Sequence, residues 1–156
     1  MRGVASAALR SYPIDPARVR LLLHGYNTTF RVDTVDRRRF ALRLNVLPHK
    51  TQANLEAELA WLTALAVETE LRLPAPFPTR DGALHTSVWS VDLGRPVAAV
   101  LMSWLPGRDL DEPTTAAMVA LGRLTARLHQ HAETWVVPAG AELPPIDSVL
   151  MNVPSR

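Results

Sequence analysis

An acidic side chain inside the apolar stripe of a predicted helix constrains the fold of this chain more than any other feature. Apolar residues recur at helical spacing between residues 51 and 67. The stripe consists of Leu55, Leu59, Leu62 and Ala66. Glu58 lies three residues after Leu55 and four before Leu62, so its carboxylate belongs to the same face. Because a carboxylate that faces a core is costly unless a cation meets it, the fold must bring a cation to this helix.

The predicted cation is Arg43, on a short strand that precedes the helix. Residues 40–44 alternate between two faces of a strand, so Ala41 and Arg43 point the same way. A strand cation held by a helix acid, beside a small residue, is one way to fix a positive charge for binding phosphate. A purely structural ion pair between sheet and helix is the alternative interpretation.

Composition narrows the class of protein. The chain has 156 residues, enough for one medium domain or for one lobe and part of another, and 47% of them are hydrophobic. Its net charge of +2 does not indicate a dedicated binder of polyanions. It has no cysteine, which excludes disulfides, thiol catalysis and thiolate metal sites. No apolar run reaches the roughly 20 residues needed to cross a bilayer, so we expect a soluble cytoplasmic protein without a membrane partner.

The pattern along the chain predicts an α+β fold. Strands are expected at residues 19–23, 30–35, 39–44, 85–91 and 97–104, and helices at 51–67 and 115–133. Five antiparallel strands with one packed helix form a plausible compact unit. The second helix carries an apolar face that the sheet does not cover, which predicts a partner chain or self-association through residues 115–133.

Six short segments, in this order, resemble one family. They are residues 22–32, 40–44, 58–62, 73–76, 102–107 and 121–129. Together they resemble the N-terminal portion of the aminoglycoside phosphotransferase and choline kinase superfamily, whose fold is similar to the protein kinases. The resemblance covers roughly residues 8 to 148. It implies a nucleotide-binding N-lobe at residues 1–104, followed at residues 105–156 by a hinge and the start of a truncated C-lobe.

The resemblance also implies roles for individual residues in binding ATP. The loop over the ATP phosphates contains Gly25, Asn27, Thr28 and Thr29, whose backbone and side-chain groups would bond phosphate oxygens. Ala41 leaves room for adenine, Arg43 replaces the usual phosphate-contacting lysine, and Glu58 is its helix partner. The hinge that offers backbone groups to the adenine edge consists of Ser103, Trp104 and Leu105. Arginine has a planar fork instead of a point charge, which still suits bidentate contact with phosphate.

The catalytic part of the family pattern is absent from this sequence. The catalytic loop of the family is His-x-Asp followed by Asn, and neither His129 nor His131 begins such a sequence. The later aspartate that holds magnesium is also missing, since Asp147 is the sole aspartate after Asp111 and lies in a proline-rich tail. Phosphoryl transfer needs such a carboxylate and the metal ligands. We therefore expect no catalytic or metal-binding residues, no site for the small-molecule acceptor, and no activity of this chain alone.

A non-catalytic nucleotide-binding or protein-interaction module, a pseudokinase fragment, is the alternative to a truncated kinase of the aminoglycoside, choline or homoserine kinase type. Nucleic-acid binding is disfavoured, because no aromatic residues interleave the three arginines at 37–39 to form a stacking platform.

Overall fold

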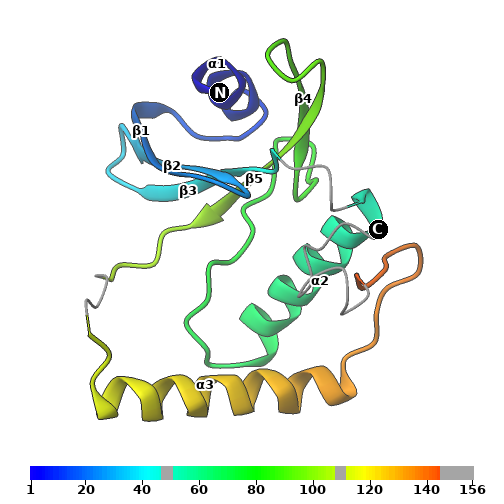
Figure 1. Ribbon diagram of the computed structural model, residues 1–156. Coiled ribbons are helices and arrows are strands. Elements are labelled where there is room, and N and C mark those ends of the chain that lie inside the picture. Colours follow the sequence, from blue (N-terminus) through cyan, green and yellow to red (C-terminus); the bar gives the residue numbers. More distant parts are fainter. Residues whose placement is uncertain (47–50, 108–111, 145–156) are drawn as a thin grey trace, which may run out of the picture. The chain divides into compact units, whose positions relative to one another are not determined.

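The chain folds into a sheet unit and a helical unit (Figure 1). The computed structural model describes residues 1–46, 51–107 and 112–144. The sheet unit comprises the described residues of Met1–His49 and Pro74–Leu105, and the helical unit those of Lys50–Leu73 and Pro106–Arg156. Asp147 falls outside the described residues. The predicted lobe boundary between residues 104 and 105 stays a prediction.

Five antiparallel strands form the sheet. They are β1 (Pro16–His24), β2 (Thr28–Thr34), β3 (Arg39–Leu44), β4 (Thr86–Ser90) and β5 (Arg95–Ser103). Their order across the sheet is β1-β2-β3-β5-β4, so β5 lies between β3 and the edge strand β4. Successive side chains of a strand point to opposite faces, and β2 accordingly alternates between buried and half-buried residues. The predicted five-stranded antiparallel sheet of an α+β fold is confirmed.

One face of the sheet, the core face, packs on the N-terminal helix α1 (Arg2–Leu9). The buried α1 residues are Val4, Ala5, Ala8 and Leu9. They share one apolar cluster with strand residues, which include Phe30, Val32, Phe40, Leu42 and Leu101. The contribution of this helix to the core was not predicted from the sequence.

Tyr12 ties the segment after α1 to the backbone of β5. Its side chain is fully buried, its hydroxyl donates to the carbonyl of Ala99 at 3.0 Å, and it accepts from the N–H of Leu101 at 3.2 Å. Thr86, the first residue of β4, pairs with Ala99, so the β4 ladder ends there. The Tyr12 hydroxyl therefore satisfies a buried N–H that the edge strand does not reach.

The β2–β3 turn contains an arginine in the left-handed backbone region. Arg37 has φ of 65°, its N–H donates to the carbonyl of Thr34, and the N–H of Thr34 donates to the carbonyl of Arg38. This conformation strains any residue with a Cβ. The Arg37→Gly variant is expected to raise the free energy of unfolding by about 0.5–1 kcal/mol, measured by urea denaturation. Arg38→Gly, which breaks a 2.7 Å ion pair with Asp36, is the control and should destabilise the protein instead.

The helical unit contains α2 (Gln52–Glu68) and α3 (Thr115–Thr134). Thr51 caps α2 by accepting from the N–H of Asn54, whose side chain accepts in return from the N–H of Thr51. The indole Nε1 of Trp61 on α2 donates to Nδ1 of His131 on α3 at 3.1 Å. Since Nδ1 accepts this bond, the proton of the neutral imidazole lies on Nε2, which is 3.1 Å from the Glu68 carboxylate.

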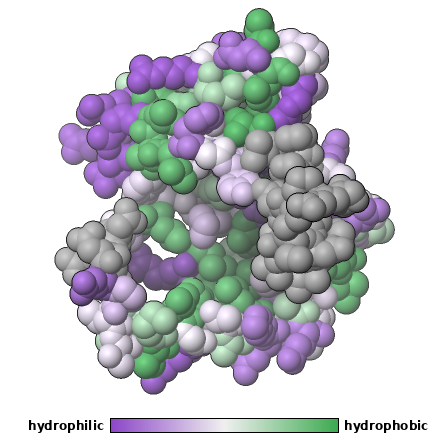
Figure 2. Space-filling view, in the orientation of Figure 1, coloured by the Kyte–Doolittle hydropathy of each residue, from purple (hydrophilic) through white to green (hydrophobic). Residues whose placement is uncertain are grey.

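In both helices, the residues that are buried differ from those that a simple amphipathic pattern predicts. The predicted stripe of α2 is wrong at its end, because Ala66 is exposed, while Asn54 and Ala57 on other sides of the helix are buried. Helix α3 has no buried residue over its whole length. Met118, Val119 and Leu121 are each about half exposed, and hydrophobic residues show at the surface of this helix in Figure 2. None of the helices among the described residues has the length and apolar character that a membrane span requires.

Candidate nucleotide site

The face of the sheet opposite α1, here called the second face, carries Ala41 and Arg43. Both lie on β3, where they alternate with the buried core residues Phe40 and Leu42, and both are half-buried. Ala41 pairs across the sheet with Met102 of β5, so a small side chain stands beside a buried thioether there. The predicted placement of Ala41 and Arg43 on one strand face follows directly from this alternation.

The β1–β2 connection presents only part of the predicted phosphate loop to the second face. The N–H of Gly25 donates to the carbonyl of Asn27 at 3.0 Å, which makes a tight reversal before β2. Thr29 pairs with Arg43 across the sheet, so its side chain lies on the second face. Thr28 has the opposite parity, is fully buried, and its hydroxyl lies 2.7 Å from Nδ1 of His24.

The Thr28 hydroxyl is therefore not on the face that carries Arg43, and of the two neighbouring threonines Thr29 is the one placed there. Strand alternation is the physical reason, because Thr28 shares its parity with the core residue Phe30. A contact of the Thr28 backbone with phosphate stays a prediction.

The three predicted hinge residues differ in whether their backbone groups are hydrogen-bonded within the protein. The N–H of Ser103 donates to the carbonyl of Ala75 at 2.9 Å, and its hydroxyl accepts from the N–H of Ala75 at 2.9 Å. The Ser103 N–H and hydroxyl are thus engaged within the protein. Within the described chain, the backbone groups of Trp104 and Leu105 make no such hydrogen bond. Among the three predicted hinge residues, Trp104 and Leu105 are therefore the two whose backbone groups have no hydrogen bond within the described chain.

Glu58 lies on α2 in the helical unit, half-buried between the buried residues Ala57 and Leu59. Arg43 lies on β3 in the sheet unit. The placement of Glu58 on a helix is as predicted, and the ion pair between Glu58 and Arg43 stays a prediction.

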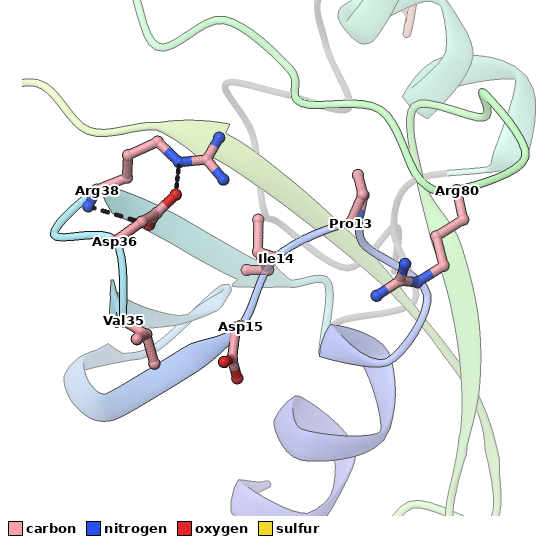
Figure 3. Close-up of a pocket in the computed structure, with 7 residues that line it drawn as sticks. All are labelled: Pro13, Ile14, Asp15, Val35, Asp36, Arg38 and Arg80. Atoms are coloured by element: carbon pink, nitrogen blue, oxygen red, sulfur yellow. Dashed lines mark hydrogen bonds and ion pairs between the residues drawn. The ribbon is translucent and has the colours of Figure 1, made fainter.

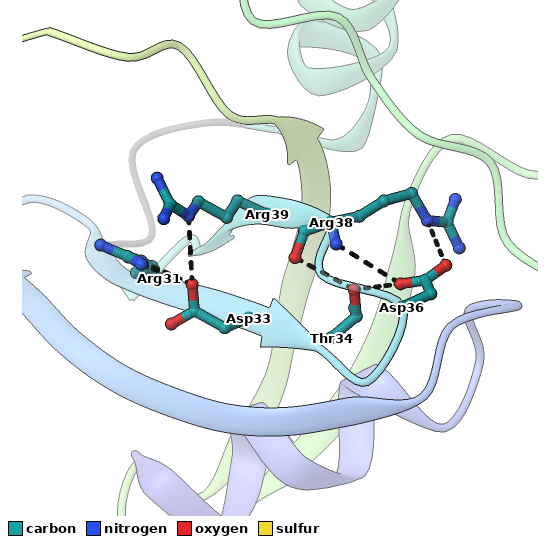
Figure 4. Close-up of polar contacts among 6 residues, drawn as sticks. All are labelled: Arg31, Asp33, Thr34, Asp36, Arg38 and Arg39. Atoms are coloured by element: carbon teal, nitrogen blue, oxygen red, sulfur yellow. Dashed lines mark hydrogen bonds and ion pairs between the residues drawn. The ribbon is translucent and has the colours of Figure 1, made fainter.

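A charged cluster on the second face was not predicted from the sequence (Figure 4). Arg31 donates to one Asp33 carboxylate oxygen through Nε at 2.9 Å and Nη2 at 2.6 Å, and Arg39 Nε lies 3.5 Å from that oxygen. The Arg31 hydrogen bond, with the charges of Arg31, Arg20 and Arg39, lowers the pKa of the Asp33 carboxyl. Counting strand positions from Phe30 would have placed Arg31 and Asp33 on the face of Ala41.

A cleft of about 430 Å³ lies elsewhere in the sheet unit (Figure 3). Its lining comes from the segment after α1, the β2–β3 turn and Arg80, and consists of Pro13, Ile14, Asp15, Val35, Asp36, Arg38 and Arg80. None of the predicted nucleotide-site residues lines this cleft. Its Asp36 carboxylate already binds the Arg38 side chain at 2.7 Å. We therefore place the candidate site on the second face and not in this cleft.

No group of three or more histidine or acidic residues in the described part of the chain is arranged to hold a metal ion.

A profile of the phosphotransferase enzyme family matches residues 18–147. The chain belongs to this family. The match includes every predicted nucleotide-site residue, from Gly25 to Leu105. It confirms the resemblance to aminoglycoside phosphotransferases and related kinases. No curated protein matches the chain.

Two solved kinase structures of this superfamily are similar to the chain. A microcompartment-associated aminopropanol kinase has 31% sequence identity and a TM-score of 0.80, over 94% of this chain and 45% of its own. An amicoumacin kinase in complex with AMP-PNP, Ca2+ and Ami has 19% identity and a TM-score of 0.72, over 87% of this chain and 41% of its own. The chain therefore spans less than half the length of either kinase, and the kinase-like N-lobe fold is confirmed.

Proposed function

We propose that the sheet unit is the nucleotide-binding lobe of a small-molecule kinase and that its second face binds ATP. The observation that carries this proposal is the row of Ala41 and Arg43 on β3, beside the open backbone groups of Trp104 and Leu105. A planar base needs a small residue beneath it and hydrogen-bonding groups at its edge. The phosphates that extend from the base need a cation nearby. Arg43 follows Ala41 by two residues and therefore lies on the same face of β3.

Each predicted residue has a defined task in this proposal. Ala41 supports the adenine, and the backbone of Trp104 and Leu105 bonds its edge. Arg43 and the backbone N–H groups of the loop that contains Gly25 and Asn27 hold the phosphates. Thr29, which pairs with Arg43, adds a hydroxyl on the same face. Glu58 orients Arg43 as its ion-pair partner.

We propose that residues 1–156 bind ATP without transferring its phosphate. The sequence lacks the His-x-Asp loop of the family, so no step of transfer is assigned to these residues. The acceptor of a whole kinase of this type would be a hydroxyl group on a small molecule, and the aminopropanol of the 31% identical kinase is an amino alcohol of this kind. A cytoplasmic location, consistent with the absence of cysteine, belongs to the same proposal.

Calorimetric titration of the purified chain with ATP and magnesium tests the proposal. We expect saturable one-to-one binding, and no turnover when an amino alcohol such as aminopropanol is added. Absence of binding by a chain with native circular dichroism would contradict the nucleotide function. Turnover that disappears in the Arg43→Ala variant would contradict the proposed inactivity.

A second candidate function, a module that docks on another chain, is favoured by the exposure of α3. Met118, Val119 and Leu121, which lie within one turn of the helix, each expose about half of their surface and leave apolar area uncovered. Under this alternative the chain forms a defined oligomer or complex in sedimentation analysis and does not bind ATP.

A further inference from the structure

Arg31 occupies the strand position next to Ala41 on the second face. Arg31 on β2 and Ala41 on β3 are direct cross-strand partners, and Ala41 in turn pairs with Met102 of β5. Directly opposed residues of antiparallel strands point to the same face, with Cβ atoms about 4.5–5.5 Å apart. A planar group that rests on Ala41 is therefore flanked by Arg31 on one side and Met102 on the other.

The guanidinium of Arg31 is held in place by two neighbours. Asp33 accepts two hydrogen bonds from its Nε and Nη2 atoms, at 2.9 and 2.6 Å (Figure 4). The Arg31 Cζ atom also lies over the ring of Trp104, 5.4 Å from its centroid. Trp104 belongs to the hinge segment that follows β5. A guanidinium fixed on one edge and on one face loses little further side-chain entropy when a ligand arrives.

The charge around Arg31 favours an anionic ligand. Arg20 pairs with Arg31 across β1 and β2, and Arg39 lies 3.5 Å from the Asp33 oxygen that Arg31 also binds. One carboxylate thus faces three arginines, which leaves a surplus positive charge. The Nε atom of Arg20 is buried and has no hydrogen-bond partner among the described residues. A nucleotide brings both a planar base and negative charge to such a surface.

We propose that Arg31 is a specificity-determining residue of the nucleotide site, which contacts the base and not the phosphates. Its guanidinium, clamped between Asp33 and the Trp104 ring, forms the wall of the base pocket beside Ala41. Planar guanidinium groups stack on aromatic rings, so the contact suits a purine better than a non-planar group. The inference rests on the proposed function, because it concerns the same site.

The test compares ATP with inorganic tripolyphosphate, which has the phosphates but no base. Both ligands are titrated with magnesium by displacement of a fluorescent ATP analogue, whose own affinity is measured for each variant. Arg31→Ala is expected to raise the ATP dissociation constant about ten-fold and that of tripolyphosphate only slightly, through the loss of one positive charge. Arg31→Lys keeps the charge but loses the planar group, and is expected to show the same selective loss.

Arg38→Ala is the matched control, since it removes an arginine of the neighbouring turn whose side chain bonds Asp36. It should leave both dissociation constants at the wild-type value. An equal loss of affinity for ATP and for tripolyphosphate in the Arg31 variants would mean that the guanidinium contacts the phosphates, and would overturn the inference. An unchanged affinity for ATP would overturn it as well. If Arg31→Ala does not fold, the lysine variant decides. If the wild type binds no ATP, the proposed function itself fails, and this inference fails with it.

Discussion

The Tyr12→Phe variant is expected to lower the free energy of unfolding by about 1–3 kcal/mol. The phenyl ring keeps the buried volume, so no cavity contributes to the effect. What is lost is the hydroxyl that accepts from the Leu101 N–H at 3.2 Å and donates to the Ala99 carbonyl at 3.0 Å. Both backbone groups then lie in the core of the sheet unit without this partner. Urea denaturation followed by far-ultraviolet circular dichroism measures the change.

The same hydroxyl predicts how stability changes at high pH. Burial raises the pKa of Tyr12 to about 12, whereas a tyrosine in an unfolded chain titrates near pH 10. Between pH 10 and 12 the unfolded state therefore loses a proton that the folded state retains. Stability from this group is complete below pH 10 and is lost as the pH rises to 12, with a slope of up to about 1.4 kcal/mol per pH unit.

Tyr12→Phe also provides the control for the pH effect, because phenylalanine cannot ionise. The wild-type chain should lose more stability than the variant between pH 10 and 12, so the difference between them narrows over this interval. A constant difference between the two proteins would contradict the assignment of a buried, neutral hydroxyl at Tyr12.

These expectations for Tyr12 could not have come from the sequence. The strands were predictable because large apolar residues recur at every second position along residues 30–32 and 40–44. Tyr12 lies instead in a short irregular segment with Pro13, and its partners are backbone atoms of β5, nearly 90 residues away. Local periodicity carries no information about such a distant contact. Helix α1 was missed as a core element for the same reason, since eight residues give a weak periodic signal.

In the candidate site, the face of β2 on which each residue lies could have been predicted from the sequence. The parity of β2 separates Thr28, which is buried, from Thr29, Arg31 and Asp33 on the second face. Phe30 marks the core face, so the sequence alone contained this distinction. The engagement of Ser103 by Ala75 was not predictable, because it depends on where the chain between α2 and β4 returns beside β5.

Hydrophobic periodicity predicted the extent of the helices but not which of their residues are buried. The ends of α3 were predicted to within one residue, because apolar residues recur along it at helical spacing. The extent of α2 was equally clear, yet Asn54 is buried and Ala66 is exposed. The Asn54 side chain donates to the carbonyl of Glu142 at 2.9 Å, and that partner lies 88 residues away. A polar residue can be buried where such a bond satisfies it, which a hydrophobicity pattern does not reveal.

Arg43→Ala is expected to weaken ATP binding by about 10- to 100-fold, the value of a charge-assisted contact with phosphate. Arg43→Lys keeps a cation at this position and should restore much of the affinity, whereas alanine removes both charge and hydrogen-bond donors. Glu58→Ala is expected to weaken binding as well, but by less, because it acts through the orientation of Arg43. Calorimetry with ATP and magnesium measures all three variants against the wild-type chain.

The double variant distinguishes a predicted Arg43–Glu58 pair from two independent effects. If Glu58 acts through Arg43, adding Glu58→Ala to Arg43→Ala causes no further loss of ATP affinity, and the two effects are strongly non-additive. Fully additive losses would mean that Glu58 does not orient Arg43. A purely structural ion pair predicts a third pattern, in which both single variants lose stability in urea but bind ATP like the wild type. The combination of binding and stability data therefore assigns this pair a role in binding or in folding.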